Sequence, residues 1–133
     1  MVAAVNNNHA FAAVAADVQY ALAGHDYFKM GNWNAALAQF NAAININPNV
    51  CGYRYMRAAC YSNLGMFPQA LAEYNTALNF AANNIDRANI HFDLAILADA
   101  MDDEEKVFFH IVAAARFGHP RAQQLCKEYG IPF

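Results

Sequence analysis

The sequence resembles itself when it is shifted so that Gly31 coincides with Gly65. In the same shift, the segment 36–38 (Ala-Leu-Ala) coincides with the identical segment 70–72. The aromatic positions also coincide: Tyr27 with Tyr61, Trp33 with Phe67, and Phe40 with Tyr74. The shift is 34 residues. A period of this length indicates a stack of supersecondary units, each of which buries its apolar face only against its neighbours.

Each unit has the spacing of a helix, a turn and a second helix. The first helix is marked by small and aromatic residues at intervals of three and four, namely Tyr20, Ala23, Gly24 and Tyr27. Gly31 suits the left-handed conformation that ends a helix, and Asn32 is a suitable cap for the next one. The inner face of the second helix comprises Ala36, Phe40, Ala43 and Ile44, and Pro48 stops it, so that the next helix begins near Val50.

This pattern resembles the tetratricopeptide repeat, a helix–turn–helix unit of about 34 residues. Counted from Asp17, the small and aromatic signature positions are all filled: Tyr20, Gly24, Tyr27, Gly31, Trp33, Ala36, Phe40, Ala43 and Pro48. The second unit starts at Cys51 and departs from the signature at Arg54 and Ala82. The signature positions that it retains are Ala58, Tyr61, Gly65, Phe67, Ala70, Tyr74 and Ala77.

A third, degenerate unit follows if the connection is three residues longer. Asp102 and Asp103 then form its turn, while His91 and Glu104 replace two aromatic residues of the signature. The inner positions become Leu94, Ala95, Ala98, Val107, Ile111 and Ala114. Gly118 ends the last long helix, and Pro120 opens a short, half-polar helix up to about Tyr129 that is suited to cap the stack.

The resemblance implies an all-α fold, a right-handed superhelical stack of antiparallel helix pairs. We expect an N-terminal extension over residues 1–16, either loose or helical, and repeats over residues 17–50, 51–87 and 88–118. Residues 119–133 form the C-terminal capping helix in this scheme. The second range includes the longer connection.

Composition excludes several classes of protein. Hydrophobic residues make up 58% of the chain and charged residues 14%, which is too apolar for a disordered chain. The net charge of −3 provides no broad positive field for nucleic acid, and no apolar run is long enough to predict a membrane span. Residues 1–16 contain no Lys or Arg, so we expect no secretory signal. Three cysteines, an odd number, favour reduced thiols in the cytoplasm.

No residue pattern indicates catalysis, so we expect a binding protein that is not an enzyme and uses no cofactor. The sequence has no glycine-rich phosphate loop, no nucleophile elbow and no Cys-x-x-Cys pair. No two of its five histidines have the four-residue spacing of a helical metal site, so we predict no metal site. The acidic run 102–105 is best explained as negative charge at the start of a helix.

In the tetratricopeptide family, the first helices of the units line a groove that holds an extended peptide or a helix of a partner. The resemblance carries this role to fixed positions of each unit: Val18, Ala21, His25, Phe28 and Lys29; Gly52, Tyr55, Ala59, Ser62 and Asn63; Asn89, Phe92, Ile96, Asp99 and Ala100. Phe28, Tyr55, Phe92 and Ile96 would be the apolar anchors. Two alternatives remain open: the chain's own termini fill the groove, or the aromatic residues pack between units.

One subgroup of the family binds the acidic C-terminal tails of chaperones through a carboxylate clamp of Lys, Asn and Arg. The residues at those five positions here are Ala21, His25, Ala59, Phe92 and Ile96. None matches the clamp, so we expect no binding of chaperone tails. The first hypothesis is an adaptor or scaffold that binds an apolar segment of an unidentified protein. The alternatives are a chaperone for a secreted client, like those of type III secretion, and a self-assembly module that forms homo-oligomers.

Overall fold

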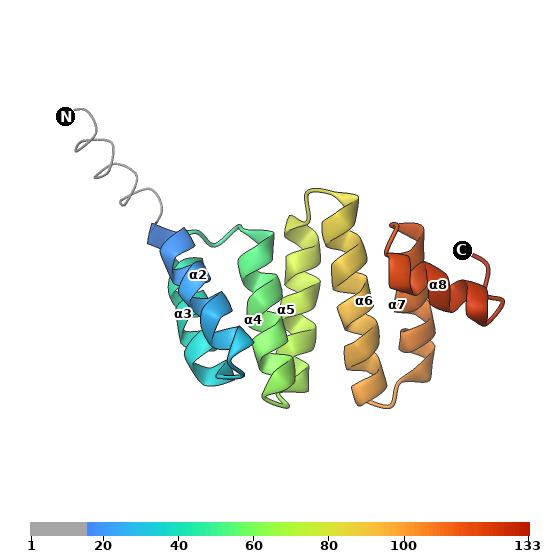
Figure 1. The fold of residues 1–133 in the computed structure, drawn as a ribbon, viewed down its shortest axis with the longest axis horizontal. Helices are drawn as coiled ribbons and strands as arrows, with labels where there is room; N and C mark the ends of the chain where they lie inside the picture. Colours follow the sequence, from blue (N-terminus) through green and yellow to red (C-terminus); the bar gives the residue numbers. More distant parts are fainter. Residues whose placement is uncertain (1–15) are drawn as a thin grey trace.

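A computed structural model of the chain describes residues 16–133, which form seven α-helices. The helices are α2 (Ala16–Lys29), α3 (Trp33–Ile46), α4 (Cys51–Asn63), α5 (Phe67–Phe80), α6 (Asn84–Ala100), α7 (Glu104–Arg116) and α8 (Pro120–Glu128). They lie side by side in chain order, with α2 and α8 at opposite ends (Figure 1). The predicted fold class, an all-α stack of antiparallel helix pairs, is therefore confirmed. The prediction for residues 1–15 lies outside the described residues.

The turn inside each pair is built the same way. Gly31 and Gly65 have φ angles of 74° and 75°, and Asp102 occupies the corresponding place between α6 and α7 with a φ of 56°. The backbone N–H of the residue that follows donates a hydrogen bond to a carbonyl of the preceding helix. The pairs are Asn32 to Tyr27, Met66 to Tyr61, and Asp103 to Ala98, each at 2.9 Å.

The residues that accept these hydrogen bonds also show the length of each repeat. The interval from Tyr61 to Ala98 is three residues longer than the interval from Tyr27 to Tyr61. The three additional residues lie before the third pair, where α6 begins with an extra turn at Asn84. Asn83 caps this turn, because its side chain accepts a hydrogen bond from the backbone N–H of Asp86 at 2.9 Å.

Small residues allow the helices of a pair to approach closely. Ala36, Ala43, Ala70, Ala77 and Ala114 are fully buried, each on the second helix of its pair. A larger side chain at these positions would not fit between the two helices, because protein interiors leave few voids larger than a water molecule. The core is consequently divided into clusters, one within each successive part of the stack.

Several predicted inner positions are less buried than expected. Tyr20 is 43% exposed, because the face that α2 buries runs instead through Asp17, Ala21 and Gly24. Val107 and Ile111 are half-buried, whereas Ala36 and Phe40 at the equivalent positions of the first pair are fully buried. The third pair therefore has an apolar side that the stack does not cover completely.

Polar side chains tie neighbouring helices together. The carboxylate of Asp17 on α2 accepts hydrogen bonds from the hydroxyl of Tyr53 on α4 at 2.8 Å and from Asn47 at 3.4 Å. The carboxylate of Glu73 on α5 pairs with Arg54 at 3.2 Å and with Arg57 at 2.8 Å, both on α4. Arg54, which stands at a signature position usually held by an aromatic residue, also lies over the ring of Phe80.

Candidate protein-binding surface

The first helices of the three pairs present the residues that the sequence predicts for a groove. We call the surface formed by these residues of α2, α4 and α6 the first-helix face. Ala21 is an exception, since it is only 7% exposed and belongs to a core cluster with Phe40. The exposed members are Val18, His25, Lys29, Gly52, Asn63, Asn89, Ile96, Asp99 and Ala100. The half-buried members are Phe28, Tyr55, Ala59, Ser62 and Phe92.

Tyr55 is held in place by its neighbours. Its hydroxyl donates a hydrogen bond to the carboxylate of Asp93 on α6, and its ring meets Tyr74 edge to face at 5.8 Å between centroids. Burial raises the pKa of Tyr55 and also that of Asp93, whose shift is opposed by the hydrogen bond from Tyr55. Tyr55 thus joins α4 to α6 and presents only part of its ring to a guest.

Phe92 is partly covered by the C-terminal end of the chain. Its ring stacks on His119, the residue before α8, with centroids 4.1 Å apart and planes 9° apart. Ile131 packs on the same apolar cluster, which contains Ala114, Ala122 and Cys126. Of the predicted apolar anchors, Ile96 is therefore the one that remains most open, at 55% exposure.

Two adjoining cavities occupy the end of the first-helix face where α6, α7 and α8 meet. One has a volume of about 310 Å³ and is lined by Asp99, Glu104, Val107, Phe108, Ile111, Leu125, Tyr129 and Ile131. The other, of about 210 Å³, is lined by Phe92, Ala95, Ile96, Asp99, Val107, Ile111 and Leu125. Their walls are apolar apart from Asp99, Glu104 and the hydroxyl of Tyr129, so the charged groups of their lining are carboxylates.

The acidic end of this surface arises from a change at two repeat positions. In the first pair these positions hold Phe28 and Trp33, whose rings meet edge to face at 4.8 Å. In the third pair the same positions hold Asp99 and Glu104, which are both exposed. Replacing two packed rings by two carboxylates leaves apolar walls with an acidic rim. The departure at Glu104 from the family signature thereby has a structural consequence.

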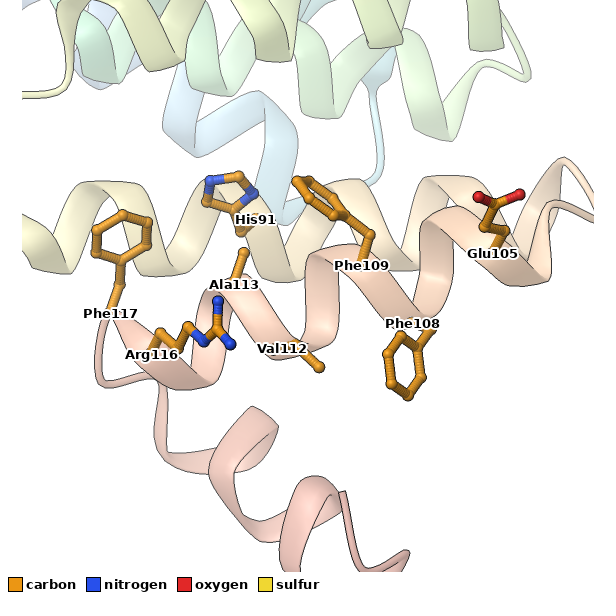
Figure 2. A pocket seen from close by; sticks show the side chains of 8 residues that line it. All are labelled: His91, Glu105, Phe108, Phe109, Val112, Ala113, Arg116 and Phe117. Carbon is orange, nitrogen blue, oxygen red and sulfur yellow. The ribbon is translucent and has the colours of Figure 1, made fainter. Parts of the chain in front are cut away.

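A larger cavity of about 610 Å³, which the repeat pattern does not predict, lies along the outer side of α7. Figure 2 shows its lining: Glu105, Phe108, Phe109, Val112, Ala113 and Arg116 of α7, together with His91 and Phe117. Phe108 and Phe109 are 55% and 61% exposed. The pattern did carry a signal for it, because α7 has apolar residues on a second face beyond the inner positions 107, 111 and 114.

Next to this cavity, two histidines form a direct contact between α6 and α7. The Nδ1 atoms of His91 and His110 are 3.0 Å apart. Burial lowers the pKa of His91, and burial with the neighbouring His91 and Lys106 lowers the pKa of His110 to about 4. At neutral pH one ring therefore donates to the other, and the pair holds the two helices together.

Among residues 16–133, no group of three His, Cys, Asp or Glu side chains is arranged to hold a metal ion. The helices described are also too short or too polar to cross a membrane.

Comparisons with known proteins identify the fold. No family model matches the sequence, and no curated protein matches it. Among solved structures, the chain is similar to the TPR2B domain of yeast Sti1 in a complex with pHsp70. The likeness has a TM-score of 0.70 at 23% sequence identity, and it covers 76% of this chain and 78% of that one. Seven helices in this arrangement give the described part of the chain the fold of a tetratricopeptide repeat domain.

Proposed function

We propose that the chain is an adaptor that binds an apolar segment of another protein on its first-helix face. The bound segment places an apolar side chain in the cavities between α6, α7 and α8, next to a Lys or Arg. The single observation that carries this proposal is the lining of those cavities, which is mostly apolar and whose charged residues are Asp99 and Glu104.

The two carboxylates are available to such a partner. Neither Asp99 nor Glu104 takes part in an ion pair within residues 16–133, and both side chains are exposed. A basic side chain of the partner would find an opposite charge there, while its apolar neighbour would replace water against Val107, Ile111 and Leu125. Charge of this kind gives orientation and specificity, and the apolar contact gives most of the affinity.

The same charges argue against an acidic partner. The similar solved structure is a complex with pHsp70. The carboxylate-clamp subgroup described above binds acidic chaperone tails. This chain has apolar or aromatic residues at four of the five clamp positions, and the nearby rim carries Asp99 and Glu104. Like charges across an interface oppose binding, so we propose that acidic tails are not its ligands. Its three cysteines are free thiols, which suits the proposed cytoplasmic location.

The experiment is fluorescence anisotropy with the full chain and two sets of labelled peptides. Both sets contain the same spaced Leu and Phe residues, and they differ only in whether Lys or Glu flanks them. We expect the basic set to bind at least tenfold more tightly than the acidic set. Equal binding of the two sets, preference for the acidic set or no binding of either would contradict the proposal.

Matched variants locate the contact. Ile96→Asp places a charge at the open anchor in the cavity and should abolish binding of the basic peptides. Ile46→Asp changes a residue of similar exposure, 50% against 55%, at the end of α3 in the first pair, and should leave binding unchanged. Circular dichroism of both variants tests whether they are folded. If Ile46→Asp abolishes binding and Ile96→Asp preserves it, the contact is elsewhere.

A further inference from the structure

We infer that the outer face of α7 pairs with the same face of a second copy of this chain, with the two helices antiparallel. This inference concerns a side of α7 that shares only Phe108 with the lining of the proposed peptide site. It explains the large cavity of Figure 2 and the two exposed phenylalanines beside it.

The residues of this face form one continuous stripe along α7. Glu105, Phe108, Phe109, Val112, Ala113 and Arg116 are related by steps of three and four residues, which is the spacing of one side of a helix. A monomer rarely leaves a stripe with two exposed phenylalanines uncovered, and such patches mark contact surfaces. The stripe covers nearly the whole of α7, from its second residue to its last.

The order of residues in the stripe is complementary to itself when reversed. A two-fold axis that passes between the two copies of α7, level with the midpoint of His110 and Ile111, brings Glu105 opposite Arg116 of the partner subunit. The same axis brings Phe109 opposite Val112 of the partner subunit, while Phe108 and Ala113 lie on opposite edges of the stripe. Each charge meets an opposite charge and each Phe109 ring meets a smaller side chain, as a symmetric interface requires.

The cavity beside the stripe provides room for the partner's side chains. Its volume of about 610 Å³ is bounded on the α6 side by His91 and Phe117, whose rings are stacked 5.7 Å apart. A phenyl ring that enters from a second copy would contact this stacked pair. Glu105 and Arg116 form no ion pair within the described part of the chain, and both are exposed.

The size of the face sets the strength of the dimer. α7 has 13 residues, so the contact is about 20 Å long. Stable interfaces use roughly 20–30 residues from each partner, and this stripe with its borders offers fewer. We therefore expect a reversible dimer with a dissociation constant on the order of micromolar, which forms and dissociates as the concentration changes.

Charge exchange tests the antiparallel arrangement by sedimentation equilibrium of the full chain over a concentration series. E105R places like charges opposite each other at both ends of the interface, and R116E does the same. Each variant alone should weaken dimerisation at least tenfold. The double variant E105R/R116E restores both attractive pairs and should dimerise as the natural chain does. An equimolar mixture of the two single variants should form heterodimers.

A second substitution tests the apolar centre. Phe109→Ser should prevent dimerisation while leaving the helical content unchanged, because Phe109 is 61% exposed in the single chain. Phe108 is not used, because it also lines the peptide cavity. The inference is overturned if the natural chain stays monomeric up to about 1 mM, or if the double variant fails to restore the dimer. Peptide binding by the monomeric Phe109→Ser variant would show that the two proposals are independent.

Discussion

Gly24 and Phe40 are in direct contact across the first helix pair. A Cβ atom placed on Gly24 would lie 2.8 Å from two carbon atoms of the Phe40 ring, and Phe40 is completely buried. The glycine therefore does not serve flexibility, because it sits inside α2, where glycine costs helix stability. It provides the space that the ring occupies.

The contact predicts that Gly24→Ala destabilises the chain, although alanine is the better helix former. Overpacking a filled core costs about 1–3 kcal/mol, which exceeds the gain of roughly 1 kcal/mol in helix propensity. The matched control is Gly52→Ala in α4, where a Cβ would meet no atom within 4 Å. Chemical unfolding should show a loss for Gly24→Ala and a small gain for Gly52→Ala. A gain in both variants would mean that Phe40 moves aside easily.

The buried ion pairs of Glu73 lead to a second prediction. Its carboxylate holds two guanidinium groups of α4, and the side chains of Arg54, Arg57 and Glu73 are only 18%, 19% and 12% exposed. Glu73→Gln keeps an acceptor oxygen but removes the negative charge that neutralises the two guanidinium groups, and should cost about 2 kcal/mol of unfolding free energy. Lys106→Gln removes the exposed pair with Asp103 and should cost less than about 0.5 kcal/mol. Similar losses in the two variants, measured by urea unfolding, would contradict this ranking.

The contact between His91 and His110 predicts a pH dependence. Burial lowers the pKa of His110 from its ordinary value of 6.5 to about 4, so the unfolded chain binds more protons than the folded chain between these values. The stabilisation is complete above pH 6.5 and is lost as the pH falls toward 4. Since His110 is partly exposed and lies near Lys106 and Asp103, we expect a loss on the order of 1 kcal/mol.

Two variants isolate the histidine pair from the carboxylates that titrate at lower pH. His110→Gln should flatten the dependence of the urea midpoint on pH between 6.5 and 4, with some loss of stability at neutral pH. His25→Gln, at an exposed residue of α2 outside the pair, is the matched control for the removal of a histidine. A slope in His110→Gln as steep as that of the natural chain would exclude the pair as its cause.

The sequence predicted the turns well because their requirements are local. Gly31, Gly65 and Gly118 all have positive φ angles, and Asn32 caps α3 by accepting from the backbone N–H of Ala35. Exposure on the first-helix face was harder to predict, since it depends on which neighbours cover each position. Ala21 is covered by the cluster around Phe40, and His119 of the capping segment stacks on Phe92. A repeat numbering treats such positions as equivalent in every unit.

The charged and exposed features of the third pair depend on differences between units. Repeat numbering identified Glu104 as a departure from the signature. Only the structure shows that the equivalent residue of the first pair, Trp33, packs against the ring of Phe28. The stripe on α7 was missed for a related reason. The signature describes inner positions alone, so Phe108 and Phe109 had no assigned role.

Asp102 supplies the last prediction, which concerns the turn of the third pair. Its φ of 56° lies in the left-handed region, where Gly31 and Gly65 stand in the other two turns. A side chain in this region raises the backbone energy, although Asp tolerates it better than most residues do. Asp102→Gly should therefore stabilise the chain by about 0.5–1 kcal/mol, and Gly65→Asp should destabilise it by a similar amount.

Asp103, which caps α7 through the N–H of Lys106, serves as the contrast: Asp103→Gly should cost a few tenths of a kcal/mol or more. Thermal unfolding of the three variants gives the order of their midpoints, and a lower midpoint for Asp102→Gly than for the natural chain would show that the side chain of Asp102 stabilises the turn.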